Sequence, residues 1–171
     1  MKNSVLVLLI ASLVVVGFGG CVWATEYDVK QDGGGDFTTI QAAVDAATSG
    51  DTIVVCEGDT PYYEAVDIST GGIILRAAIN ESPIIDAQNI RSYCITMKEY
   101  VCGNNVTVDG FICRNFTCAT GQKVGGIWLR SGVNHIVKNC EIYGGPSSGS
   151  DKADISSYGG SNATIENNYL H

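Results

Sequence analysis

The chain has 171 residues and a formal net charge of −8 at pH 7, from 18 acidic and 10 basic side chains. Lysine and arginine form no cluster in it, so nucleic acid is not expected as a partner, because phosphate binding needs concentrated positive charge. The length suits one domain with a sizeable core. The acidic balance favours solubility and would suit metal cations, but it names no ligand.

Residues 1–24 have the three parts of a secretory signal peptide. Lys2 precedes an apolar run at 5–18, which is shorter than the about 20 residues that a membrane-spanning helix needs. Val22 and Ala24 fit the positions that a signal peptidase reads, so we expect the mature domain to be 25–171.

Two alternatives to this cleavage stay open. Phe18-Gly19-Gly20-Cys21 resembles a lipoprotein signal, in which the chain is cut before Cys21 and lipid is attached to its sulfur. The segment could also be retained as an uncleaved anchor. All three interpretations predict an extracellular or cell-surface protein that contacts the membrane only through its N-terminal segment or a lipid.

Six of the seven cysteines follow the signal segment, and an even number in an exported chain permits disulfides. The sequence does not choose among the 15 pairings that six cysteines allow. Cys113 and Cys140 also suit simple core packing. Sequons for glycosylation of a secreted protein begin at Asn105, Asn115 and Asn162.

The mature chain begins with a short predicted strand at Tyr27–Val29 and one convincing helix. Thr38 and Gln41 are spaced as a capping box, and Ile40, Ala43, Val44 and Ala47 share one helical face. Gly50 is expected to end the helix. A single amphipathic helix before a run of strands is predicted to cover the open end of the first coil.

Short β-branched segments separated by turn residues follow, and they are predicted to be strands. They are Thr52–Cys56, Ala65–Ile68, Ile73–Ala77, Pro83–Asp86, Cys94–Met97 and Val106–Asp109.

The last third of the chain repeats itself. Ile127, Val137, Cys140 and Ile142 recur 28 residues later as Ile155, Ile165, Asn168 and Leu170. Val108, Phe111 and Cys113 form a half-match 29 residues upstream of Val137, Cys140 and Ile142. A fixed period in this range marks a solenoid. The sequence therefore predicts an all-β protein: a single-stranded parallel β-helix of about five coils with a short N-terminal capping helix.

The stretch from Val29 to Glu64 resembles the opening of the pectin-lyase-like superfamily, and of pectin methylesterases in particular. The matching segments are 32–47 (DGGGDFTTIQAAVDAA) and 50–55 (GDTIVV), followed by Gly58, Tyr63 and Glu64. Residues 106–115 and 164–170 look like the Asn-rich coils of β-helix repeats. The resemblance implies a right-handed parallel β-helix and an extracellular life among polysaccharides.

The catalytic motifs of pectin methylesterases are absent. The glutamine-containing strand, the paired aspartates and the downstream arginine find no counterparts, although Gly125–Leu129 stands where the first would be expected. The family's active-site residues are therefore not carried over to this chain.

A charge ladder is predicted on the outer face of stacked strands, at Asp109, Lys138 and Glu166. Lyases of the resembled fold use a basic residue beside a sugar carboxylate, often with calcium, so Lys138 is a candidate base, with Arg130 and Asp154 as neighbouring charges. The competing interpretation, a solvated salt-bridge ladder, is favoured.

An aromatic platform for a sugar ring is predicted at Trp128, Arg130 and Tyr158, if Ile127 and Leu129 point inward. The alternative is an isolated surface aromatic, or a cation–π pair of Tyr158 with Arg130. Asp151 and Asp154 are candidate calcium ligands, although a solvated turn explains them as well. No cofactor is required, and Ca²⁺ is the one that these residues would suit.

These features predict an exported module that binds polysaccharide or helps to process it. One alternative is a polysaccharide lyase or hydrolase acting on acidic glycans. The other is a structural surface protein that associates end to end, because the sequence stops at His171 inside a predicted coil.

Overall fold

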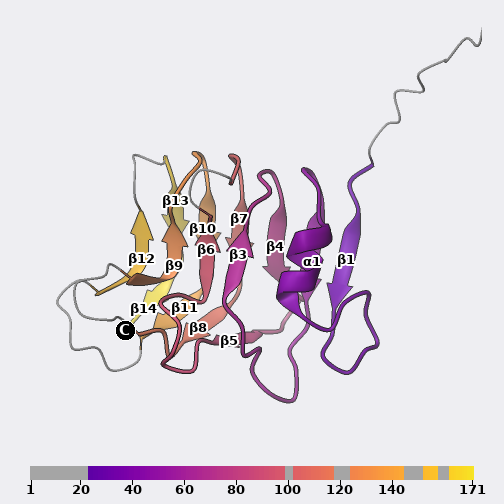
Figure 1. Ribbon diagram of the computed structural model, residues 1–171, viewed down its shortest axis with the longest axis horizontal. Coiled ribbons are helices and arrows are strands. Elements are labelled where there is room, and N and C mark those ends of the chain that lie inside the picture. Colours follow the sequence, from indigo (N-terminus) through magenta and orange to yellow (C-terminus); the bar gives the residue numbers. More distant parts are fainter. Residues whose placement is uncertain (1–22, 99–101, 118–123, 145–151, 158–161) are drawn as a thin grey trace, which may run out of the picture.

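Three parallel sheets make up nearly all of the computed structural model, which describes residues 23–98, 102–117, 124–144, 152–157 and 162–171 (Figure 1). Sheet A contains, in order, β1 (Glu26–Val29), β2 (Thr52–Val55), β4 (Ile74–Ala77), β7 (Thr107–Asp109), β10 (Ile136–Lys138) and β13 (Thr164–Glu166). Sheet B contains β5 (Ile84–Asp86), β8 (Ile112–Arg114), β11 (Glu141–Tyr143) and β14 (Tyr169–Leu170). Sheet C contains β3 (Val66–Ile68), β6 (Ile95–Met97), β9 (Val124–Leu129) and β12 (Lys152–Ser157).

From β4 onward the chain visits sheets A, B and C in rotation, which confirms the predicted parallel β-helix. Sheet C has four strands, so the solenoid has about four turns as far as β12, and β13 and β14 begin another. The predicted count of about five coils includes this partial turn.

The strand register follows the sequence period. Val137 lies between Val108 and Ile165 in sheet A, and Ile127 lies opposite Ile155 in sheet C. These are the partners that the 28- and 29-residue offsets predict. A register shifted by one residue would turn every apolar side chain outward, so the apolar period is sufficient to fix the pairing.

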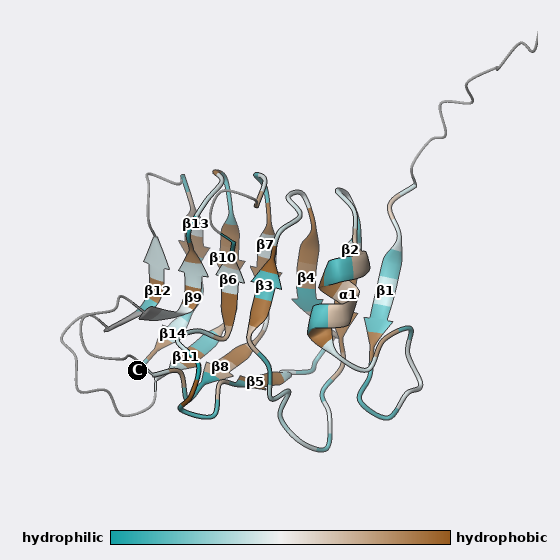
Figure 2. Ribbon diagram, viewed as in Figure 1, coloured by the Kyte–Doolittle hydropathy of each residue, from teal (hydrophilic) through white to brown (hydrophobic). Residues whose placement is uncertain are grey.

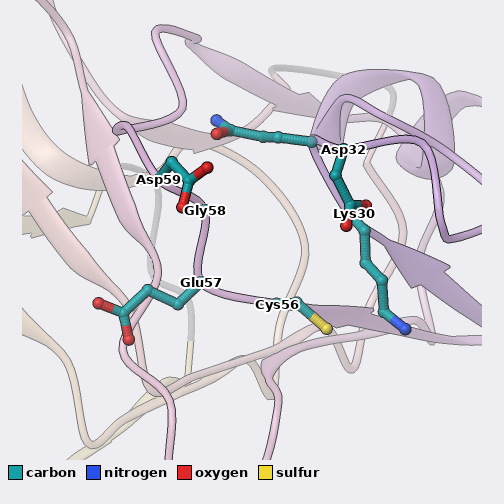
Figure 3. A pocket seen from close by; sticks show the side chains of 7 residues that line it. Lys30, Asp32, Cys56, Glu57, Gly58 and Asp59 are labelled. Atoms are coloured by element: carbon teal, nitrogen blue, oxygen red, sulfur yellow. The ribbon is translucent and has the colours of Figure 1, made fainter.

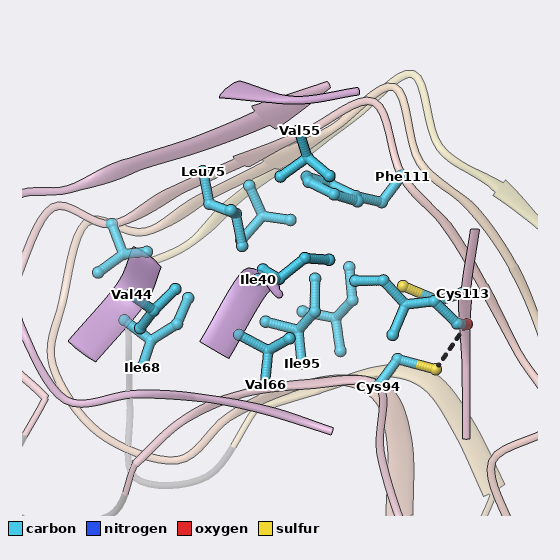
Figure 4. Packing of buried hydrophobic residues seen from close by; sticks show 14 of the residues in the cluster. Ile40, Val44, Val55, Val66, Ile68, Leu75, Cys94, Ile95, Phe111 and Cys113 are labelled. Atoms are coloured by element: carbon cyan, nitrogen blue, oxygen red, sulfur yellow. Dashed lines mark hydrogen bonds between the residues drawn. The ribbon is translucent and has the colours of Figure 1, made fainter. Parts of the chain in front are cut away.

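The core is the interior of the coil, where the inward side chains of all three sheets meet. Val108, Phe111, Ile127 and Val137 are completely buried. Figure 2 shows the apolar segments recurring along the strands, and Figure 4 shows the side chains from successive turns pointing into one interior. No single turn could bury these residues alone, because each turn's inward side chains are covered by its neighbours.

The cysteines of the described segments lie mostly in this core as free thiols. Cys94, Cys113 and Cys140 are buried, and none of the five described cysteines is in a disulfide. The neighbouring Cys94 and burial hold the pKa of Cys113 well above its usual range. Burial raises the pKa of Cys140 to about 11. Cys113 and Cys140 therefore stay protonated and pack as small apolar groups, as expected. Cys118 lies outside the described residues.

Asparagines make several of the turns between strands. Asn139 and Asn167 both have left-handed backbone, with φ of 54° and 55°. Asparagine tolerates this conformation better than most residues, so the two positions suit turns between strands. Asn168 faces inward, where its amide accepts from Cys140 N at 2.9 Å and donates to Val137 O at 2.9 Å, joining two successive turns.

The helix α1 (Ile40–Ala46) begins one residue later than the capping box predicts. Thr39, not Thr38, is the N-cap, and its hydroxyl accepts from Ala42 N at 3.3 Å. The carboxylate of Glu64 completes the cap, accepting from Ile40 N at 3.0 Å and Gln41 N at 2.9 Å. A carboxylate distant in sequence therefore satisfies two N–H groups of the first turn, and the side chain of Gln41 makes a different contact from the one that a capping box predicts.

α1 covers the first strand of sheet C, as the predicted cap would. Ile40, Ala43 and Val44 are buried, and the helix stands next to β3 at the end of the sheet (Figure 1). The side chain of Gln41 accepts from Asp67 N at 2.7 Å and donates to Asp67 O at 3.2 Å. The amide thus pairs with β3 as a strand would and blocks its exposed edge.

A completely buried histidine makes stability depend on pH. His135 Nδ1 accepts from Val106 N at 3.2 Å and Nε2 lies 2.8 Å from Ser131 O, a pattern that fits the neutral ring. Burial lowers the pKa of His135 below 6.5. Below about pH 6.5 the unfolded chain therefore binds more protons at this residue than the folded chain does. The stability that depends on neutral His135 is full above about pH 6.5 and is lost as pH falls towards the folded-state pKa.

We expect His135→Gln to flatten the stability of the protein between pH 7 and 5, because glutamine supplies one acceptor and one donor without titrating. Urea unfolding at several pH values measures this, and His171→Gln, at an exposed position, is the matched control. An unchanged pH profile in the His135 variant would contradict the assignment.

Candidate functional site

A column of outward residues on sheet C forms the candidate site. Asp67, Thr96, Trp128 and Ser156 stand side by side on β3, β6, β9 and β12. Trp128 is partly exposed, whereas Ile127 and Leu129 on either side of it are completely buried. The predicted outward orientation of Trp128 is therefore found in the structure, and Ser156 lies beside it on the next turn.

Arg130 completes a cation–π pair with Trp128. Its guanidinium carbon lies 4.4 Å from the centroid of the indole ring. Such a contact is favourable and orients the guanidinium flat on the aromatic face. The sequence predicted Trp128 and Arg130 on one platform, and the structure brings them together. Tyr158, the third member of that prediction, lies outside the described residues.

Tyr93 is the member of the site that sequence analysis missed. Its ring centroid lies 6.4 Å from that of Trp128, with an interplanar angle of 58°. Its hydroxyl donates to Asp67 Oδ1 at 2.7 Å. Burial, and then the bond to the Asp67 carboxylate, raise the pKa of Tyr93 to about 12, so the phenol stays a donor. Tyr93 precedes β6 at a position that the repeat does not cover, so no periodic signal pointed to it.

We call Trp128, Arg130, Tyr93 and Asp67 the aromatic shelf. Thr96 lies beneath it, nearly fully buried, with its hydroxyl donating to Trp128 O at 3.0 Å. The hydroxyl of Ser156 is buried without a hydrogen-bond partner among the described residues. The shelf thus combines two aromatic rings, a guanidinium and a carboxylate on the strands of sheet C or next to them, an arrangement suited to binding.

The predicted charge ladder exists, but it lies on sheet A. Lys138 stands between Asp109 and Glu166 in register, and its ammonium is 3.4 Å from Asp109 Oδ2. Asn139 Nδ2 donates to Asp109 Oδ1 at 2.7 Å. Both oxygens of Asp109 are therefore occupied, and the half-exposed ion pair fits a surface ladder that contributes little to stability.

The candidate catalytic residues are spread over two sheets. Lys138 is on β10 of sheet A, whereas Asp154 is on β12 of sheet C and Arg130 directly follows β9 of the same sheet. The structure does not gather Lys138 with the other two. Of the candidate calcium ligands, Asp154 is on β12 and Asp151 lies outside the described residues. Within the described ranges no group of three or more metal-ligating side chains comes together.

The predicted modification sites occupy different environments. Asn105 and Asn162 are exposed, whereas the Asn115 amide donates to Asp86 Oδ2 at 2.9 Å. Cys21, the alternative lipid attachment site, lies outside the described residues. No helix in the described part of the chain is long and apolar enough to cross a membrane.

A small pocket lies in the loops that follow β1 and β2 (Figure 3). It has a volume of about 250 Å³ and is lined by Lys30, Gln31, Asp32, Cys56, Glu57, Gly58 and Asp59. Burial, and then the negative charge of Glu81, raise the pKa of Cys56, which keeps this thiol protonated and a poor nucleophile. The pocket comes from loops on the first turns, away from the aromatic shelf, and offers no recognisable catalytic set.

Neither a protein-family model nor a curated protein matches this chain. The structure itself establishes the architecture, which is a parallel β-solenoid of the kind found in β-helix superfamilies.

Proposed function

We propose that this chain is an exported module of the pectin-lyase-like superfamily that binds polysaccharide outside the cell or at its surface, through the aromatic shelf. The observation that carries this is the cluster on sheet C, where Arg130 stacks on Trp128 at 4.4 Å and Tyr93 stands 6.4 Å away. Both rings are partly exposed and lie beside a guanidinium and a carboxylate, so they offer a ligand an apolar surface with polar groups around it.

The chemistry of the shelf matches that of a sugar ring. The apolar face of a pyranose packs against an aromatic ring, while its hydroxyls need polar partners around the rim. Arg130 supplies hydrogen-bond donors, and the Asp67 carboxylate supplies acceptors beside the Tyr93 hydroxyl. Because all of these groups stand on strands or next to them, a ligand would meet a surface that is already organised.

The superfamily assignment is supported by residues of the resembling segment that have structural roles in the first turn. Glu64 caps α1 with both carboxylate oxygens. A side chain at Gly35 would place its Cβ 2.6 Å from Asp28 O, so only glycine fits there. Residues of the resembled opening therefore hold the helix and first coil in place, which is what a shared architecture requires.

We expect Trp128→Ala to weaken retention on the bound polysaccharide at least tenfold, which corresponds to about 1.4 kcal/mol. A glycan array followed by affinity electrophoresis measures it, and circular dichroism checks the fold. Tyr63→Ala, which removes an aromatic that is 50% exposed and outside the shelf, is the matched control.

Arg130→Met separates stacking from charge, since methionine keeps a long side chain but no donor. A loss for acidic glycans alone would indicate an ion pair with a sugar carboxylate, and a loss for all glycans would indicate general hydrogen bonding. Equal retention of the Trp128, Tyr63 and unmodified proteins would remove the shelf from the binding site.

A further inference from the structure

One buried carboxylate near the start of the domain has no cationic partner. Asp51 is 1% exposed, and in the part of the chain that the structure describes no lysine, arginine or histidine forms an ion pair with it. Its oxygens instead accept from Thr25 N at 2.7 Å, Thr48 N at 2.7 Å and Thr48 Oγ1 at 2.9 Å. The charge of Asp51 is held by neutral donors alone, and a cationic donor at the same place would add Coulomb attraction to the contact.

Thr25 is the residue at which the chain enters the fold. Its nitrogen is held by Asp51, and its carbonyl oxygen accepts from Thr52 N at 2.8 Å. The residues before it are solvent-exposed: Ala24 is exposed, and Trp23 is 84% exposed. Thr25 is itself exposed, but among the described residues it is the first whose backbone is held by hydrogen bonds at both its nitrogen and its carbonyl oxygen. The bond between Ala24 and Thr25 therefore lies where the fold begins.

Two independent observations concern the bond between Ala24 and Thr25. The pattern of Val22 and Ala24 places signal-peptidase cleavage after Ala24, and the fold places the nitrogen of Thr25 against a buried carboxylate. We propose that the Ala24–Thr25 bond is the processing site of this protein, and that the Thr25 ammonium freed by cleavage forms an internal ion pair with Asp51. This proposal rests on the exported state proposed above, and not on polysaccharide binding.

The covalent step is a hydrolysis by a signal peptidase. Water adds across the bond between the Ala24 carbonyl carbon and the Thr25 nitrogen. Ala24 leaves with a carboxylate, and Thr25 keeps the nitrogen, which is protonated near neutral pH because α-amino groups have a pKa of about 7.7–8.0. No electron is transferred. The amide donor that Asp51 holds in the precursor becomes an ammonium donor in the mature chain.

The exchange strengthens the contact. The amide of Thr25 already makes a charge-assisted hydrogen bond to the Asp51 carboxylate. An ammonium adds the Coulomb attraction of opposite charges to this bond and offsets the cost of burying the carboxylate. The mature protein is therefore more stable than its precursor.

The test compares two chains that differ only before Thr25. One comprises residues 25–171 and is released from an N-terminal fusion so that Thr25 carries the free amine. The other comprises residues 23–171, in which the nitrogen of Thr25 remains an amide. Each is made with Asp51 and with Asp51→Asn, and urea unfolding at pH 7 gives four folding equilibrium constants.

We expect the constant of the free-Thr25 chain to be about tenfold larger than that of the extended chain, and the ratio to fall to about one with Asp51→Asn. Equal constants in the Asp51 background, or a ratio that persists in the Asp51→Asn background, would overturn the ion pair.

Two further measurements keep the proposal testable if Asp51→Asn does not fold. The α-amine of Thr25 should react with an acylating reagent at least tenfold more slowly than the α-amine of Trp23 in the extended chain, because an internal ion pair shields it. The full chain, secreted from a bacterial host, should yield an N-terminus at Thr25 by intact mass. Equal reactivity would refute the ion pair, and an N-terminus at Cys21 would refute the processing site.

Discussion

Replacing Phe111 by alanine is expected to destabilise the protein by about 3–5 kcal/mol and to lower its Tm by roughly 10 °C. Phe111 is completely buried and points into the interior of the coil (Figure 4). Its removal deletes apolar surface and leaves a cavity, because neighbours held by strand pairing on three sides relax only partly. Urea and thermal unfolding followed by circular dichroism measure the loss.

The control for this prediction is Ile79→Ala, which shortens a large apolar side chain that is 81% exposed. Its unfolding free energy should change by no more than about 0.5 kcal/mol. Phe111→Leu should fall between the two, because leucine fills part of the cavity. A Phe111→Ala protein as stable as the control would show that this position does not lie in the packed interior.

Replacing Asp86 by alanine is the second large change, with an expected cost of about 2–4 kcal/mol at pH 7. Its buried carboxylate accepts from Gln88 N at 2.8 Å, Arg114 Nε at 2.9 Å and Asn115 Nδ2 at 2.9 Å. Alanine leaves all three donors without this acceptor. Because Asp86 and Arg114 stand on neighbouring strands of sheet B, the loss also loosens the contact between two turns.

The same residue contributes to acid sensitivity. Burial raises the pKa of Asp86, but the donors from Gln88, Asn115 and Arg114 outweigh it, so the pKa is lowered overall. A lowered pKa gives stability that is full above the unfolded value of about 3.9 and is lost as pH falls through the folded value. Asp86→Ala should therefore lose less stability than the unmodified protein between pH 5 and 3. Asp59→Ala, an exposed carboxylate, serves as the control, and a parallel acid profile for all three proteins would contradict the assignment.

The later turns could be predicted from sequence because their side chains repeat with a constant period. Val108, Val137 and Ile165 occupy equivalent positions in register. Val108 and Val137 are completely buried, whereas Ile165 on the last strand of sheet A is 49% exposed. A shift by one residue would turn the buried pair outward, so burial selects the register. The outward positions alternate with these inward ones along each strand, so Asp109, Lys138 and Trp128 could be placed on the correct faces.

The first turn was harder to predict because distant residues complete it. Thr38 fitted a local capping rule, but Glu64 satisfies the helix N-terminus and moves the cap to Thr39. The strand β1 lies beside β2 although a helix separates them in sequence.

Tyr93 was missed in the sequence because its contacts, too, are with distant residues. Its partners Asp67 and Trp128 lie 26 and 35 positions away, in turns of unequal length that no simple period connects.

Asp67 joins two parts of the molecule that have separate roles. Its backbone pairs with the Gln41 amide of α1, and its carboxylate holds the Tyr93 hydroxyl. The helix therefore sets the position of the strand that orients one ring of the shelf. A shortened version of this protein that starts after α1 would keep every shelf residue and still misalign them, so engineered forms should retain the helix as part of the recognition surface.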